Sequence, residues 1–152
     1  MLSKLNEFFA HLITPNQDAQ QPTHTLQLAT AVLLVEVMRA DAASSEAELA
    51  TVMRALKERF QLSDSEGQRL SALGQETARH ASDLYQFTSL LNRELSREEK
   101  VRIAEYMWQV AYADRHLGAH ENHLMRRMTE LLHLSQADYI TAKMRAKPAG
   151  ME

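Results

Sequence analysis

The chain has 152 residues, of which 45% are hydrophobic, and a formal net charge of −3 at pH 7. This length and hydrophobic share suit one domain with a single core. The acidic balance gives no electrostatic case for binding nucleic acid, whose phosphates attract basic surfaces. The lack of cysteine excludes disulfides, thiolate chemistry and cysteine-ligated zinc, and the 4 glycines and 3 prolines leave too few tight turns for an all-β fold.

Residues 1–23 are predicted to form an N-terminal amphipathic helix followed by a linker. The helix is expected over 2–13, because apolar residues recur there at helical spacing. They are Leu2, Leu5, Phe9, Leu12 and Ile13. This stripe is expected to dock on the domain, with membrane or partner binding as the alternative. Residues 14–23 are polar and contain two prolines, which is typical of a linker.

Residues 24–147 are predicted to form one helical domain, followed by a disordered tail at 148–152. Serine followed three residues later by glutamate predicts helix starts at Ser45, Ser63 and Ser96, because the two side chains can satisfy unbonded N–H groups there. Ser82 and Ser135 indicate two further starts. We therefore expect an all-α, compact bundle of about seven to eight helices, over residues 2–13, 24–41, 46–60, 64–80, 83–93, 97–114, 119–133 and 136–146. No segment is long and apolar enough to span a membrane, so a cytoplasmic location is expected.

The chain contains a weak internal repeat, because residues 32–49 superpose on 105–122 after a shift of 73 positions. Each half has an apolar helix, then an Ala-Asp pair, then a glutamate that opens the next helix. The acidic residues that correspond are Asp41 with Asp114 and Glu48 with Glu121. The repeat halves, around 32–63 and 105–135, predict a pseudo-two-fold bundle in which the helices at 24–41 and 97–114 pack together.

This doubled pattern of Ala-Asp, short loop and glutamate resembles the TerB-like family, which includes tellurite-resistance TerB and the N-terminal domain of the co-chaperone DjlA. The resemblance covers about residues 24–146, and the segment Ser82-Asp-Leu-Tyr-Gln-Phe-Thr is similar to an uncharacterised branch of the family. Where the family usually has glycine after each aspartate, this chain has Ala42 and Arg115. The resemblance implies a helical fold, divalent-metal binding by acidic residues and a link to stress responses, without an established reaction.

The candidate metal ligands are Asp41, Glu48, Asp114 and Glu121. Carboxylates are hard oxygen ligands, which favour Ca²⁺, Mg²⁺ or Mn²⁺ over zinc, and Ca or Mg is the expected ion. Neither loop follows the 12-residue pattern of an EF-hand. The residues alone favour a simpler alternative, in which the glutamates cap helix N-termini and the aspartates hydrogen-bond loop N–H groups.

A second cluster contains three histidines beside Glu121, namely His116, His120 and His123. A solvated histidine-rich surface is favoured over a zinc site, because the corresponding positions in the first half are all alanine. A di-iron site of ferritin type needs two Glu-x-x-His motifs, and only Glu130 to His133 provides one.

The sequence also lacks the motifs of nucleophilic catalysis and of phosphate-binding loops. We therefore expect a non-enzymatic accessory or stress-response domain that binds a divalent cation through its paired acidic loops. The alternative is a metal-free protein–protein interaction module with an unknown protein partner. A metal-dependent hydrolase is a less favoured third hypothesis.

Overall fold

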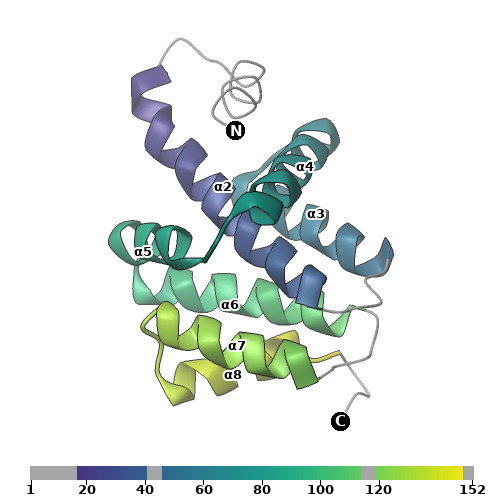
Figure 1. The fold of residues 1–152 in the computed structure, drawn as a ribbon, viewed down its shortest axis with the longest axis vertical. Coiled ribbons are helices and arrows are strands. Elements are labelled where there is room, and N and C mark those ends of the chain that lie inside the picture. Colours follow the sequence, from purple (N-terminus) through teal and green to yellow (C-terminus); the bar gives the residue numbers. More distant parts are fainter. Residues whose placement is uncertain (1–16, 41–45, 114–118, 149–152) are drawn as a thin grey trace.

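The computed structural model describes residues 17–40, 46–113 and 119–148. The helix expected at 2–13 lies outside this part, as do Asp41 and Asp114. The described residues form seven helices and no strand, which confirms the all-α prediction (Figure 1). The helices are α2 (Gln17–Ala40), α3 (Glu46–Phe60), α4 (Asp64–His80), α5 (Tyr85–Glu94), α6 (Arg97–Tyr112), α7 (Ala119–Leu131) and α8 (Gln136–Ala146). No helix in these three ranges is long and apolar enough to cross a membrane.

Helix α2 begins at Gln17, so residues 17–23 are helical and the prediction of a linker there was wrong. Pro22 is a signal for a linker, but it lies within the helix. Proline lacks an N–H and therefore removes one helical hydrogen bond. The segment Gln17-Asp-Ala-Gln-Gln contains three glutamines and an alanine, which are good helix formers, and no glycine.

The serine signals located most helix starts correctly. Ser63, Ser96 and Ser135 each cap the next helix, and each forms a reciprocal pair of hydrogen bonds with the acidic residue three positions later. The exception is α5, which starts two residues later than predicted, at Tyr85. Its first N–H is bound by the Asp83 carboxylate at 2.8 Å, while the capping position, Leu84, has no side-chain hydrogen bond.

The core forms around α2 and α6, which contact each other as predicted. Figure 1 shows α2 running diagonally through the upper part of the molecule, α6 crossing beneath it, and α7 and α8 at the lower end. Nearly every residue from Leu28 to Val37 is buried, as expected for a helix that is apolar almost all round. In α6 the fully buried Trp108 stacks on Tyr112, with ring centroids 5.7 Å apart, and meets Tyr139 of α8 edge-on at 5.5 Å.

The second helix of each half, α3 or α7, ends in the same way. Gln61 and His133 both have a left-handed backbone, with φ of 57° and 56°. The next residue in each case donates its N–H to a carbonyl of the last turn: Leu62 to Lys57 at 3.1 Å, and Leu134 to Thr129 at 3.0 Å. These are matching Schellman-type ends.

Several of the contacts between helices also correspond in the two halves. Helix α2 packs on α4 as α6 packs on α8. Across the halves, α3 contacts α6 and α7 contacts α2. The helix ends and these packing partners follow the internal repeat, but α3 also packs on α4, and α7 has no comparable contact with α8 among the described residues.

Helix α4 approaches α2 closely because it has a glycine at the contact. A Cβ built on Gly74 would lie 2.9 Å from Cβ of Ala31 and 3.3 Å from its carbonyl oxygen. Contacts this short do not occur between real Cβ atoms, so a side chain there would push the two helices apart. A Cβ on Gly67, in the same helix, would lie 2.7 Å from Cγ of the Lys57 side chain and at an ordinary 3.7 Å from the Met53 carbonyl oxygen.

Candidate functional site

Two of the four predicted metal ligands lie in the described part of the chain, and both are buried. Glu48 is in the first turn of α3 with an exposed fraction of 0%, and Glu121 is in the first turn of α7 with 1%. The other two, Asp41 and Asp114, lie in the loops outside the described residues. The structure thus places one glutamate of each half in an equivalent, solvent-excluded position.

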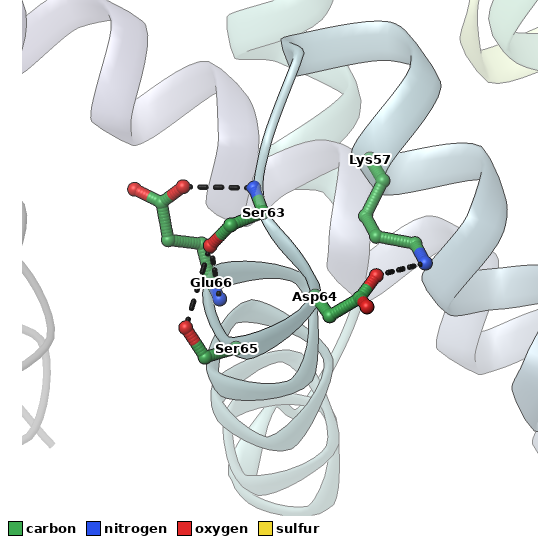
Figure 2. Close-up of polar contacts among 5 residues, drawn as sticks. All are labelled: Lys57, Ser63, Asp64, Ser65 and Glu66. Carbon is green, nitrogen blue, oxygen red and sulfur yellow. Dashed lines mark hydrogen bonds and ion pairs between the residues drawn. The ribbon is translucent and has the colours of Figure 1, made fainter.

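Two other glutamates that cap helix starts are placed differently in this molecule. Figure 2 shows Glu66, which accepts the Ser63 N–H at 2.8 Å while the Ser63 hydroxyl accepts the Glu66 N–H at 3.2 Å. Glu99 does the same with Ser96 at the start of α6, and its side chain remains 47% exposed. Helix capping therefore does not require burial of the carboxylate, so capping alone does not explain where Glu48 and Glu121 lie.

A buried carboxylate loses its hydration, and the fold must compensate with hydrogen bonds, a cationic side chain or a metal ion. Asp138, at the start of α8 and 5% exposed, shows one such solution. Two guanidinium nitrogens of Arg97 donate to it at 3.1 and 2.5 Å, and the Ser135 N–H donates at 3.1 Å. The hydrogen bond from Arg97 is the main reason that the pKa of Asp138 falls to about 2.

Glu48 and Glu121 also make interactions of their own, so neither carboxylate is isolated. Each side chain opens a helix whose preceding loop, 41–45 or 114–118, contains the predicted aspartate. A carboxylate at a helix N-terminus is favoured by the helix dipole. Carboxylate oxygens are also the donors that Ca²⁺ and Mg²⁺ prefer. The positions of the two glutamates are therefore compatible with cation binding and with capping of the helix start.

Among the described residues there is no group of three or more histidine, aspartate or glutamate side chains placed to hold an ion. His123 lies exposed on α7, while His116 and the side chain of His120 are outside the described part. The predicted ligand set of Asp41, Glu48, Asp114 and Glu121 includes the undescribed loops and remains a prediction.

One surface feature was missed by the sequence analysis. A cleft of about 360 Å³ lies between α2, α7 and the segment that joins α4 to α5. Its charged rim includes Arg39, Arg79 and Arg127. These arginines are far apart in the sequence and form no motif, so only the packing of the three helices reveals that they meet.

Comparison with known families gives the decisive observation about ancestry. The family described as Tellurite resistance protein TerB matches residues 27–144, which is most of the chain. The chain belongs to the TerB family. No curated protein and no solved structure gives a significant match. The matched region of this TerB-family chain includes both acidic loops, both buried glutamates and all three cleft arginines.

Proposed function

We propose that this TerB-family chain is a non-enzymatic accessory domain that binds a divalent cation, with Asp41, Glu48, Asp114 and Glu121 as protein ligands. The observation that carries the proposal is the burial of Glu48 and Glu121 at equivalent helix starts of the two halves. The capping glutamates of α4 and α6 stay exposed or half-exposed, and the one capping acid that is buried, Asp138, is bound by Arg97. A cation is one of the few partners that compensate a buried carboxylate.

The donor chemistry favours Ca²⁺ or Mg²⁺. Each loop and the helix after it supply two carboxylates, and backbone carbonyls and water would complete the six to eight oxygens of Ca²⁺ or the six of Mg²⁺. Asp41 directly follows the last residue of α2, and Glu48 lies in the first turn of α3. A bound ion would therefore tie the end of one helix to the start of the next.

The test is a thermal unfolding series on protein freed of metal with a chelator. A ligand that binds only the folded state adds about 2.7 kcal/mol when its concentration is 100 times Kd. The melting temperature should therefore rise by several degrees on adding millimolar Ca²⁺, Mg²⁺ or Mn²⁺. The Glu48→Gln/Glu121→Gln and Asp41→Asn/Asp114→Asn variants should lose this rise.

The matched control is Glu66→Gln/Glu99→Gln, which removes two carboxylates that also sit at helix starts but cap them from the surface. This variant should keep the full cation response. Because the buried glutamates also support the fold, the readout is the change on adding cation, compared within each variant. If the native chain shows no response at millimolar concentration of any of the three ions, the proposal is wrong.

A metal-free interaction module is the second candidate, and one surface feature favours it. Ile140 and Met144 lie one turn apart on α8 and are 50% and 61% exposed, which leaves an apolar pair on the surface. A protein partner that binds there should be lost in Ile140→Gln/Met144→Gln and kept in Glu48→Gln/Glu121→Gln, as measured by affinity capture from the native host. Retention of every captured protein by the Ile140→Gln/Met144→Gln variant would rule out this surface.

A further inference from the structure

The cleft beside α7 combines an apolar floor with a charged rim. It lies where the last turns of α2, the end of α4, the segment 81–84 and one face of α7 meet. The floor consists of small and aliphatic side chains, namely Ala78, Ala81, Leu84, Leu124, Met128 and Leu131. Its volume of about 360 Å³ is within the range of sites that hold small organic ligands.

Three guanidinium groups line the rim of this cleft, and each comes from a different helix. Arg39 is in the last turn of α2, Arg79 in the last turn of α4, and Arg127 in the middle of α7. Like charges around one small opening repel one another, which costs free energy unless an anion offsets it. Arginine also has five N–H donors in a planar fork that matches carboxylate and phosphate oxygens.

The acidic groups nearby accept only some of the N–H donors of these arginines. Glu36 accepts one guanidinium N–H of Arg39 at 2.7 Å, and Glu76 accepts one from Arg79 at 2.5 Å. Both are pairs within one helix turn, which hold the arginine in place and leave its other donors available.

The other two charged groups of the rim behave differently. Asp83 is engaged in capping α5 through the N–H of Tyr85. Arg127 makes no ion pair with any residue that the structure describes. It is therefore the rim arginine most available to an incoming anion.

We propose that this cleft binds an organic anion that consists of an apolar body and a single carboxylate or phosphate group. The body would lie on the floor formed by the aliphatic side chains, and the anionic group would be held by Arg127 together with Arg39 and Arg79. The carboxylates of Glu36 and Asp83 on the same rim disfavour a long polyanion such as nucleic acid. This site is separate from the acidic loops and goes beyond the cation binding proposed above.

The test compares four small probes that separate charge from apolar contact. Octyl phosphate and octanoate carry both features, 1-octanol carries only the chain, and inorganic phosphate carries only the charge. Binding is followed by two-dimensional NMR of the backbone amides, at concentrations below those at which the amphiphiles form micelles. The two octyl anions should shift the amides of residues 81–85 and 124–131 and bind at least tenfold more tightly than either single-feature probe.

Substitutions then assign the binding to the rim. Arg127→Gln should weaken the binding of octyl phosphate at least tenfold, because it removes a charge-assisted hydrogen bond. Arg126→Gln is the matched control, since Arg126 is the exposed neighbour on α7 that does not line the cleft. It should change the affinity less than twofold. Both variants should keep the native melting temperature and the same response to cation.

A final experiment distinguishes the two possible sources of such an anion, a membrane lipid and a dissolved small molecule. Phosphatidylcholine vesicles with and without phosphatidic acid present the phosphate on a membrane, while octyl phosphate presents it in solution. Binding to either source that Arg127→Gln weakens supports the proposal and identifies the source. The proposal is overturned if neither octyl anion binds at millimolar concentration and the anionic vesicles do not bind either. Equal effects of the Arg127 and Arg126 substitutions would also overturn it.

Discussion

The first half of the chain, α2 to α4, and the second half, α6 to α8, share their turns but differ in how the last helix of each half is stabilised. Both halves end their second helix with a left-handed residue, Gln61 or His133, and both then cap the third helix with a serine. The acid after that serine differs. Glu66 makes only the capping hydrogen bond, whereas Asp138 is also bound by Arg97.

The halves also differ in how closely their helices approach. Helix α4 reaches α2 through Gly74. The residue the same number of positions after the serine cap in the second half is Ala146, at the end of α8. The two halves therefore share their backbone turns and their buried glutamates. They differ in the contacts that stabilise the third helix, α4 or α8.

The largest expected effect is that of Gly74→Ala. The new methyl group would meet Ala31 at less than the closest normal contact, and the backbone of α2 cannot move aside as a side chain can. We expect a loss of about 1–3 kcal/mol in the free energy of unfolding, measured by urea denaturation. Gly67→Ala in the same helix should cost less than Gly74→Ala, because its close contacts are with the side chain of Lys57 and not with the backbone of another helix. Equal losses would show that the α2–α4 contact is not limited by this glycine.

A smaller effect is expected for Asp138→Asn. The folded-state pKa of Asp138, about 2, lies below its ordinary value of 3.8, so its charge stabilises the fold at neutral pH. We expect the free energy of unfolding of the variant to be lower by about 1–2 kcal/mol at pH 7. The stabilisation is complete above pH 3.8 and fades as the pH falls through 2, so native chain and variant should converge near pH 2.

Glu66→Gln, the corresponding change in the first half, should cost less than about 0.5 kcal/mol, because its carboxylate is bound only at a surface cap. Both measurements use urea unfolding at a series of pH values. A difference for Asp138→Asn that stays constant from pH 7 to pH 2 would contradict the role assigned to its charge.

Small effects of the opposite sign are expected at the matched turns. Gln61→Gly and His133→Gly should each stabilise the fold by about 0.5–1 kcal/mol, because glycine adopts a left-handed backbone without the steric cost of a side chain. The two gains should be similar in thermal unfolding, since both residues end their helices with the same hydrogen bond. A gain at one turn and a loss at the other would show that the two turns are not equivalent.

Most of the helical framework could be predicted from the sequence, because its signals are local. A serine and the acid three residues later decide a helix start through hydrogen bonds within one turn, and Ser63, Ser96 and Ser135 were located in this way. The start of α2 was missed because Pro22 is a strong local signal against a helix. The late start of α5 was missed because Asp83, rather than Ser82, binds the first N–H.

The candidate sites were less accessible to sequence reasoning, because they depend on burial and on contacts between distant segments. The sequence identified Glu48 and Glu121 as acids at helix starts, but the same pattern describes Glu66 and Glu99. Only packing distinguishes the buried pair from the surface pair. The cleft depends on α2, α4 and α7 coming together, and no spacing within one segment indicates that.

The aromatic contacts between α6 and α8 also provide a way to observe unfolding. Trp108 is the only tryptophan in the chain, and it is enclosed by Tyr112, by Tyr139 and by the Lys143 ammonium, which lies 5.0 Å from its ring. Its fluorescence therefore reports on whether α8 remains packed against α6. Combined with circular dichroism, which registers every helix, this one indole provides an optical means of asking whether the two halves of the molecule come apart together or in turn.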